Sequence, residues 1–562
     1  MKTQPATSRT LRRSPVLLAM LAFAATGEAT AMDVQDKGYE PTPASVRPPT
    51  QAEEAAMRQR LDDEIVLGVE GVASQQREYE TMIALGVNPD DPVARAAFLA
   101  ESQASPGGIE AVNAGNYMLD SGWGNGGLNP DRYAGSNDGI YRGIKAARLS
   151  NGDVVVVGEV TFPGGVKQLG ITRRGPNGAR IAWPNVDAQY SHFSGQYIIY
   201  PNGNTAVPAV YSVHDVKVYG DSIYVLVTGR LIEPNTYAPN VLRFNADGSG
   251  PGWWFAYDDP GNTINDAVAM DIYSDKLVVL GRHSLGVTGG FWTVKWTLDS
   301  GGGLTDATFG DFPAPGGYDR SEPADIAFRR FGSLVPIGGN PGYYVLFSRK
   351  YSADSASEDF DPCLLAATGA NEPDDGFAAP SGVRCMPFDQ SESTSRDKAV
   401  ALTTNGWGFP PNAHEGVQVV AIVARSLNDG VGMWELVDRA NHPVFGTGPD
   451  GLGLGRILFG AHIPTDLAIS GDYMLVSGYK SDSLGESSML AQVHGHTGAV
   501  QQVSTFASGY SSGRFNSLVV RDEAHVVGIG EAIDSTIPTA SARTQIMTGL
   551  GNDDSIFENG FD

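Results

Sequence analysis

The chain changes character at residue 116, where short apolar runs begin to alternate with turns rich in Gly, Asn and Asp. In seven places two apolar strands flank such a turn, which is the pattern of a β-hairpin. Two of the seven, beginning at Ala324 and Asp397, are degenerate and carry long insertions. The predicted hairpins cover residues 144–160, 213–229, 265–281, 324–348, 397–424, 465–478 and 516–530.

A second kind of hairpin follows several of the first, with an alternating strand, a turn centred on Asn-Gly, Asp-Gly or a similar pair, and a further strand. Examples cover residues 167–183, 240–255, 291–310, 432–446 and 489–506. Four strands in each unit of about 50–75 residues indicate a repeat architecture. We therefore predict an all-β fold, a seven-bladed β-propeller of four-stranded antiparallel blades, because a closed ring leaves only short, protected edges. A series of separate β-sandwiches is the alternative.

The stretch "NYMLDSGWGNGGL", residues 116–128, stands alone before the first complete unit. The last unit, in turn, ends without its final strand. We expect Tyr117–Asp120 to supply that strand by pairing with the chain around Thr544–Met547, which would close the ring with a blade made from both ends.

The N-terminal region has the order of a secretory signal peptide, with a basic segment, an apolar run too short to span a bilayer and a small-residue cleavage site after Ala31. We expect a secreted or periplasmic protein. The expected organisation is a signal peptide at 1–31, a flexible linker at 32–49, a helical N-terminal segment at 50–110, the propeller at 116–550 and an acidic tail at 551–562.

The charge of the chain limits its partners. Removing residues 1–31 takes away four cations and one anion and changes the formal net charge from −25 to −28. So acidic a protein is repelled by nucleic acids and anionic lipids. We expect no nucleic-acid partner, no membrane span and a monomer, with a protein or glycan as the possible ligand.

Two cysteines occur, Cys363 and Cys385. In an exported protein they would most simply form a disulfide, which closes a loop of about 20 residues and is worth roughly 3 kcal/mol in the chain-entropy model. Two buried free thiols are the alternative. Without a nearby histidine the two cysteines do not form a zinc site.

The repeats resemble the delta-60 bacterial repeat. The resemblance rests on an Asp near the first strand, an apolar strand that ends in Gly, and a later "D-x-x-F-G" ending, best seen in residues 265–281 and 291–310. It covers residues 116–340 well and 460–535 in part, and in "LDSGWGNGG" Trp123 replaces the usual Phe. The resemblance implies a propeller-like fold in an extracellular or surface protein and adds no catalytic residue.

A polar residue recurs near the start of the first strand in most units. If these strands line a central channel, the side chains gather near one mouth. They could bind a cation such as Ca²⁺, which prefers oxygen ligands, or they could hydrogen-bond backbone N–H groups of neighbouring blades. The set comprises Asp215, Asp266, Asp325, Asp397, Asp466 and Asn516.

Other candidates have simpler structural explanations. "GYSSG" at 509–513 matches a nucleophile elbow, but it lies between strands with no helix after it. His494 and His496 could begin a metal site, yet they fall at a hairpin turn that we expect to face solvent. His214 could hydrogen-bond Asp215. Aromatic residues could stack on sugars or pack in the core, namely Trp253, Trp254, Phe255, Trp292, Trp296 and Trp407.

The sequence therefore predicts an exported, non-enzymatic β-propeller that acts as a binding or scaffold protein. The alternative is a propeller hydrolase or lyase whose site is built from loops at the channel mouth. We expect no resident cofactor apart from a possible Ca²⁺.

Overall fold

The structure is a computed structural model. It describes residues 117–552 with gaps, the longest of which are 132–139, 201–208, 256–265, 313–320, 331–339, 351–359, 389–396, 406–418 and 534–542. The described residues form strands and turns, and they include no helix, hence none that could span a membrane. The predicted signal peptide, linker and helical segment lie outside the described residues, as does most of the acidic tail, whose first two residues end the last strand.

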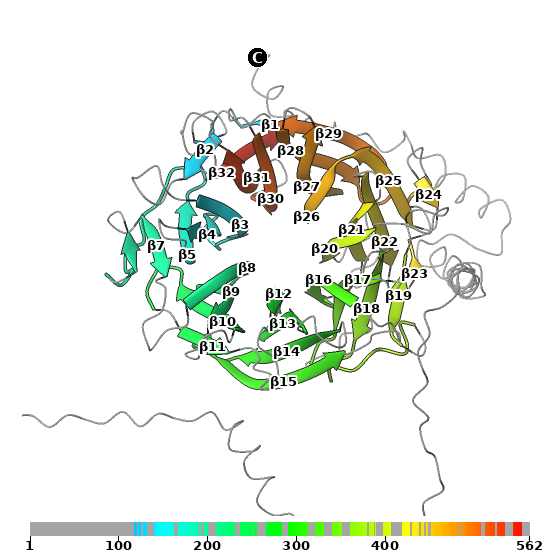
Figure 1. The fold of residues 1–562 in the computed structure, drawn as a ribbon, viewed down its shortest axis with the longest axis horizontal. Helices are drawn as coiled ribbons and strands as arrows, with labels where there is room; N and C mark the ends of the chain where they lie inside the picture. Colours follow the sequence, from blue (N-terminus) through cyan, green and yellow to red (C-terminus); the bar gives the residue numbers. More distant parts are fainter. Residues whose placement is uncertain are drawn as a thin grey trace, which may run out of the picture. The chain divides into compact units, whose positions relative to one another are not determined.

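Seven antiparallel sheets form a ring and confirm the predicted seven-bladed β-propeller (Figure 1). The first strand of each blade lies nearest the centre, and each of these inner strands contacts the inner strand of the next blade. Blade 1 contains β3 (Ile140–Arg148), β4 (Val154–Thr161), β5 (Lys167–Arg174), β6 (Ser191–His192) and β7 (Tyr197–Tyr200). Blade 2 contains β8 (Ala209–Tyr219), β9 (Ser222–Arg230), β10 (Tyr237–Asn245) and β11 (Gly252–Phe255). Blade 3 contains β12 (Asp266–Tyr273), β13 (Lys276–Arg282), β14 (Phe291–Leu298) and β15 (Leu304–Phe312).

The remaining blades follow in chain order. Blade 4 contains β16 (Ser321–Phe328), β17 (Tyr343–Lys350), β18 (Phe360–Ala367) and β19 (Val383–Cys385). Blade 5 contains β20 (Lys398–Asn405), β21 (Val419–Ser426), β22 (Gly430–Val437), β23 (Ala440–Asn441), β24 (Gly451–Gly453) and β25 (Arg456–Ala461). Blade 6 contains β26 (Ile463–Ser470), β27 (Tyr473–Asp482), β28 (Gly485–His494) and β29 (Val500–Phe506); blade 7 contains β30 (Ser512–Val520), β31 (His525–Ile533) and β32 (Arg543–Asn552) with β1 (Tyr117–Leu119) and β2 (Leu128–Asp131).

The second strand of each blade explains the continuous apolar runs in the sequence. In β4, Val154 to Val157 are all at most 1% exposed, although their side chains point alternately to opposite faces of the sheet. Both faces are buried because each blade packs against a blade on either side. A separate apolar cluster fills each of the seven interfaces, including the one between blade 7 and blade 1, where Trp123 packs with Val154 and Val527.

The two ends of the described chain close the ring, as predicted, but in a different register. β1 pairs with the end of β32, with Tyr117 opposite Asn552, whereas Gln545–Met547 of the expected partner segment pair with β2. The outer strand of blade 7 is therefore split in two, and a turn between the halves inserts Trp123 against Gly549. A Cβ atom at Gly549 would lie 2.7 Å from the indole, so this contact requires glycine.

All seven predicted inner hairpins are present, but two of the predicted outer hairpins are wrong. In blade 1, residues 179–183 form only a single bridge, between Arg180 and Arg174, and the fourth strand is β7. In blade 5, β23 is two residues long and the main outer strand is β25. In both blades the chain makes a longer excursion before it returns to the sheet, and the local turn pattern hides that excursion.

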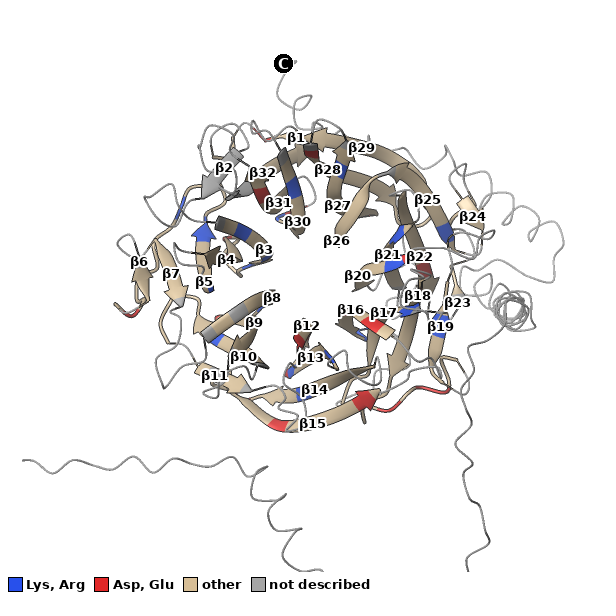
Figure 2. Cartoon of the chain, in the orientation of Figure 1, with Lys and Arg blue, Asp and Glu red and all other residues tan. Residues whose placement is uncertain are grey.

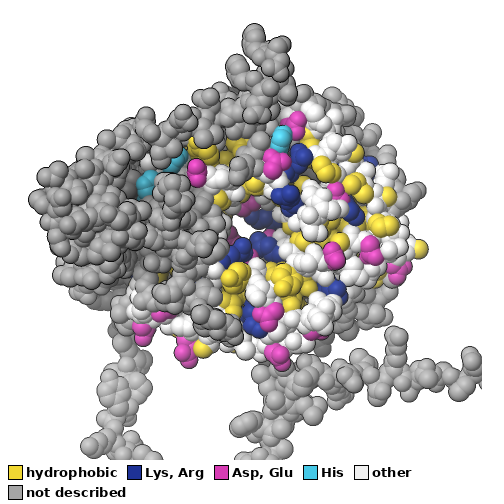
Figure 3. All heavy atoms as spheres, turned by 180° about the vertical axis from the view of Figure 1, so that it is seen from behind, with side chains coloured by type: hydrophobic (Ala, Val, Ile, Leu, Met, Phe, Trp, Pro, Cys, Tyr) yellow, Lys and Arg dark blue, Asp and Glu magenta, His cyan; other side chains and the backbone are white. Residues whose placement is uncertain are grey.

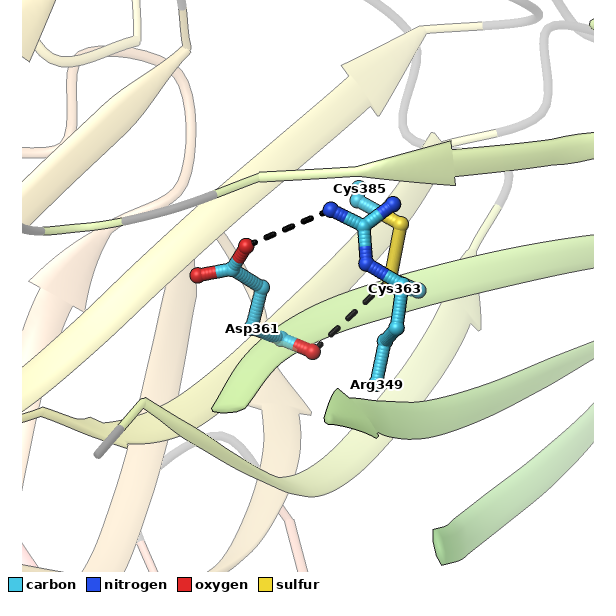
Figure 4. Close-up of a disulfide and its surroundings, with 4 residues drawn as sticks. All are labelled: Arg349, Asp361, Cys363 and Cys385. Carbon is cyan, nitrogen blue, oxygen red and sulfur yellow. Dashed lines mark hydrogen bonds and ion pairs between the residues drawn. A yellow bond between two sulfur atoms is a disulfide. The ribbon is translucent and has the colours of Figure 1, made fainter. Parts of the chain in front are cut away.

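The predicted disulfide joins Cys363 of β18 to Cys385 of β19, at a sequence separation of 22. The two cysteines are opposite each other in the strand register, so the bond fastens the outer edge of blade 4 to its neighbouring strand (Figure 4). A buried ion pair lies beside it, with Arg349 Nη2 3.5 Å from Asp361 Oδ2.

Candidate functional site

Every inner strand has a β-bulge at the same height in the ring. The extra residue shifts the pairing by one and redirects the next side chain. The bulged residues are Ile144, His214, Val268, Ala324, Val400, Thr465 and Asn516. The residues just after the bulge, which we call the post-bulge position, are Lys145, Asp215, Ala269, Asp325, Ala401, Asp466 and Ser517.

Three aspartates at the post-bulge position connect alternate blades to their neighbours. Asp215 Oδ2 of blade 2 accepts the N–H of Met270 in blade 3 at 3.0 Å. Asp325 Oδ2 of blade 4 accepts the N–H of Leu402 in blade 5 at 2.9 Å. Asp466 Oδ2 of blade 6 accepts the N–H of Leu518 in blade 7 at 3.0 Å. Each donor follows a post-bulge Ala or Ser, so one contact repeats three times around the ring.

The structure brings together only three of the six residues that the sequence grouped as one ring. Asp266 lies at the start of β12 and bonds Arg282 Nη2 at 2.7 Å. Asp397 precedes β20 and accepts the N–H of Phe388 at 2.8 Å. Asn516 is itself a bulged residue, and its amide donates to the carbonyl of Gly143 at 2.8 Å. These three do not line the channel cavity, because the bulge and the unequal loops shift them away from the post-bulge position.

A cavity of about 270 Å³ lies in the channel between the inner strands. Figure 2 shows acidic residues on β12 and β16 and basic residues on β3, and Figure 3 shows basic side chains around the channel opening. Backbone and side-chain atoms of all seven inner strands line the cavity, among them four carboxylates and three cations. The charged residues are Lys145, Asp215, Lys217, Asp271, Asp325, Arg330 and Asp466.

The three cations form ion pairs with three of the carboxylates. Lys145 Nζ lies 2.8 Å from Asp466 Oδ1, across the channel from blade 1 to blade 6.

Within blade 2, Lys217 Nζ lies 3.3 Å from Asp215 Oδ2. Arg330 donates to both oxygens of Asp271 at 2.7 and 2.8 Å, and Asp271 also accepts the N–H of Phe328 in blade 4 at 2.8 Å. These groups hold the blades together as well as lining the cavity.

Asp325 differs from the other three carboxylates, because no cation of the described residues lies within 4 Å of it. Its Oδ1 accepts the N–H of Ile326 at 2.8 Å, and its Oδ2 accepts the N–H of Leu402. Burial raises the pKa of Asp325 to about 6, although Lys145 and Lys217 act in the opposite direction. Burial also works against the charge of Asp466, but its contact with Lys145 keeps that pKa below the usual range.

His214 lines the same cavity from the bulge of β8. Its Nε2 lies 2.8 Å from Ser212 Oγ and 2.8 Å from Thr228 Oγ1, with Asp266 Oδ1 at 3.5 Å. The expected partner Asp215 instead bonds the next blade. Burial lowers the pKa of His214, so its imidazole is neutral at pH 7.

A larger and more open hollow of about 520 Å³ lies between the tight turns of blades 2 and 3. Its polar groups already stabilise those turns. Tyr224 donates its hydroxyl to the carbonyl of Gly302 at 2.9 Å, and Arg243 donates to Ser222 at 2.9 Å. Asp299 Oδ1 accepts the N–H of Gly303 at 2.7 Å. We therefore place the candidate site in the channel.

A second group of titratable residues is buried between blades 5 and 6. The rings of His442 and His496 are 5.2 Å apart, and Glu435 is 1% exposed. Burial raises the pKa of Glu435 and lowers those of His442 and His496. His496 thus contacts a neighbouring blade, and the ring of His494 packs on Tyr473 of its own blade, contrary to the predicted solvent-facing turn. Within the described residues no three His, Cys, Asp or Glu side chains are placed to hold a metal ion.

None of the remaining sequence candidates whose side chains the structure describes lines the cavity. Trp292 and Trp296 are 0% and 5% exposed and belong to the core between blades 2 and 3, where Trp254 also packs. Trp407 and Gly509 lie outside the described residues. Ser512 already belongs to β30, so a strand follows the "GYSSG" segment.

The sequence reasoning missed Lys145, Lys217, Asp271 and Arg330. A local signal exists for one of them, because Asp215-Val-Lys217 places both charges on one strand two residues apart. No local signal exists for Lys145, whose partner Asp466 is 321 residues away in the chain.

The fold is similar to those of several solved structures. A protein of unknown function from Dyadobacter fermentans shares 9% identity at a TM-score of 0.38, with 76% of this chain and 99% of that chain covered. The polysaccharide lyase Uly1 shares 11% identity at a TM-score of 0.39, with coverages of 81% and 95%. The β-propeller domain of the Trilobed protease from Pyrococcus furiosus shares 8% identity at 0.38, with coverages of 73% and 95%. Sequence identities and TM-scores this low say nothing about the activity of this protein.

No protein-family model and no curated protein sequence matches the chain. The resemblance to the delta-60 repeat therefore stays a prediction.

Proposed function

We propose that the protein is an exported, non-enzymatic binding protein that takes a small polar ligand into its central channel. The observation that carries this proposal is the charged cavity of about 270 Å³ at the centre of the ring. Asp215, Asp271 and Asp466 each hold a backbone N–H of the next blade and an ion-pair partner, so their carboxylates serve the fold. A ligand would meet the remaining hydrogen-bonding capacity of the lysines and of Asp325.

The lining of the cavity favours polar over apolar ligands. It includes seven charged side chains, and hydroxyl groups come from Thr403, Thr404, Thr465 and Ser517. None of the described lining residues is Phe, Tyr or Trp, so the cavity has no large aromatic surface on which a sugar could stack. Small-molecule sites usually combine an apolar wall with a few polar groups. This cavity reverses that balance and suits a ligand that is polar over most of its surface.

A hydrolase or lyase is the second candidate, and one observation supports it. Asp325 has a pKa of about 6 and the neutral imidazole of His214 lines the same cavity. General acid–base catalysis uses groups whose pKa lies near the working pH. An enzyme of this kind would require a ligand that contacts both groups.

Thermal-shift measurements on the purified protein with separate panels of monosaccharides, amino acids and small carboxylic acids test the proposal. Calorimetry on a compound that raises the Tm should then give an affinity that Lys217→Met weakens. Lys276→Met is the matched control, since Lys276 bonds Asp275 and Thr297 at a tight turn and does not line the cavity.

If no compound of any panel stabilises the protein, the binding proposal is wrong. If a stabilising compound is also cleaved, and Asp325→Asn abolishes cleavage while binding persists, the enzyme is the correct function.

A further inference from the structure

The three aspartates at the post-bulge position allow a comparison within one molecule. Asp215, Asp325 and Asp466 occupy equivalent positions, and each accepts a backbone N–H of the next blade. Asp215 and Asp466 each also contact a lysine ammonium, at 3.3 and 2.8 Å. Asp325 has no such contact with any described residue. Among the three equivalent carboxylates in the cavity, two therefore contact a lysine ammonium, and Asp325 contacts none among the described residues.

The sequence explains this difference. Two residues beyond Asp215, blade 2 has Lys217, whereas two residues beyond Asp325, blade 4 has Ala327. Both residues line the cavity, so the small Ala327 side chain leaves space where blade 2 has a lysine. The lysine of blade 1, Lys145, extends instead to Asp466.

The cavity also provides donors for an anion near Asp325. Lys145 and Lys217 each contact one carboxylate within 4 Å, and an ammonium group has three N–H donors. Both lysines act electrostatically on Asp325, so the three charges share one space. A ligand bound at Asp325 consequently experiences a carboxylate and two ammonium groups together.

This combination disfavours a ligand with a single charge. A simple amine on Asp325 is repelled by the two lysines, and a simple carboxylate on the lysines is repelled by four nearby carboxylates. A molecule with both charges satisfies both sets of groups. The cavity volume of about 270 Å³ corresponds to roughly nine water molecules at about 30 Å³ each, so there is room for a molecule as small as a free amino acid.

We propose that the channel cavity binds a free zwitterionic amino acid, with its ammonium group on Asp325 and its carboxylate on Lys145 and Lys217. This inference rests on the proposed binding function and specifies its ligand class. The ammonium group takes the place that Lys217 occupies beside Asp215. The ligand's side chain lies along the apolar part of the lining, which includes Val268 and Ala327.

Calorimetry and thermal shift with each of the twenty common L-amino acids test the proposal, with D-glucose, ethylamine and acetate as separate probes. For the amino acid that binds best, the N-acetyl derivative removes the ammonium charge and the amide derivative removes the carboxylate. We expect both derivatives to bind at least tenfold more weakly than the parent amino acid, and ethylamine and acetate not to bind.

Two variants connect binding to the named residues. Asp325→Asn keeps an oxygen for the Leu402 N–H but loses the charge, and should weaken binding at least tenfold. Lys217→Met should weaken binding through the ligand's carboxylate. Asp397→Asn is the matched control, because Asp397 also accepts a backbone N–H but does not line the cavity. It should leave the affinity unchanged.

The outcomes separate this inference from the proposed function. Binding of D-glucose without binding of any amino acid overturns the zwitterion but leaves a binding protein. Amino-acid binding that Asp325→Asn and Lys217→Met leave unchanged also overturns it. No binding of any probe overturns the zwitterion, and if the panels of the first test also fail, the binding function falls with it.

Discussion

Tyr117 pairs with Asn552 across β1 and β32, so the two ends of the described chain form the outer part of one blade. The side chain of Tyr117 is buried against blade 6, and Trp123, in the turn that follows, is buried against blade 1. The segment before the first repeat thus fills both interfaces of blade 7. Its loss should open the ring at this blade.

Replacement of Trp123 by Ala should lower the free energy of unfolding by about 3–5 kcal/mol, the usual cost of removing a fully buried aromatic side chain. Urea denaturation followed by tryptophan fluorescence and circular dichroism measures the loss. Met118→Ala is the control, because Met118 lies in the adjacent strand but is 54% exposed, and it should change stability by less than about 0.5 kcal/mol. Equal effects of the two variants would contradict closure through this segment.

Removal of the disulfide by Cys363→Ala with Cys385→Ala should cost about 3 kcal/mol, because the bond closes a loop of 22 residues. Both cysteines lie in blade 4, so the effect should be largest in its outer strand β19. Hydrogen exchange measured by mass spectrometry should show that the variant exchanges faster than the wild type, with a larger increase in residues 383–385 than in the inner strand β16. Uniform acceleration over all seven blades would contradict a local role.

The inner hairpins could be predicted because each is a local feature. Residues 265–281, for example, contain both strands, the turn and the alternation, with no long excursion between them. The fourth strand of blade 1 could not be predicted in this way, since β7 returns to β5 only after a 22-residue excursion from Arg174. Strand pairing over such a distance depends on the whole ring, and a short turn motif at residues 177–178 competed with it.

The channel was only partly predictable for a different reason. The bulge in each inner strand changes the alternation by one residue, so the recurring acids do not share one register. Asp271 and Lys217, two residues beyond the post-bulge position, reach the cavity, whereas Asp266 does not. Ion pairs such as that between Lys145 and Asp466 join blades far apart in the chain. Only a closed ring brings them together.

Asp325 should make the stability of the protein depend on pH. Its pKa is about 6 in the folded protein and about 3.9 when unfolded, so between these values the folded state binds more protons than the unfolded state. The free energy of unfolding contributed by this group therefore falls as the pH rises through that window. Because Asp325 is partly exposed to the water of the cavity, Asp325→Asn should stabilise the protein by only about 1–2 kcal/mol at pH 7.5.

Urea denaturation at several pH values checks this expectation, and the difference between Asp325→Asn and the wild type should disappear near pH 4. The matched control is Asp215→Asn, which removes an equivalent carboxylate that has an ammonium partner. It should destabilise the protein at pH 7.5, because Lys217 then loses that partner. If both variants are destabilised, the ionised form of Asp325 does not destabilise the folded protein, and the expectation is wrong.

The histidines between blades 5 and 6 should have the opposite dependence on pH. Burial, with a smaller effect from His494, lowers the pKa of His496 to about 4, against about 6.5 in an unfolded chain. Between these values the unfolded state binds more protons, so this contribution to stability is complete above pH 6.5 and is lost as the pH falls towards 4. The buried His442, 5.2 Å from His496, acts in the same direction, because burial lowers its pKa too.

In His496→Asn the stability should fall by roughly 1–2 kcal/mol less between pH 7.5 and pH 5 than in the wild type, as measured by urea denaturation at both values. His525→Asn is the control, because His525 bonds Asp522 at an exposed turn of blade 7, and an equally large change in that variant would contradict a special role for His496.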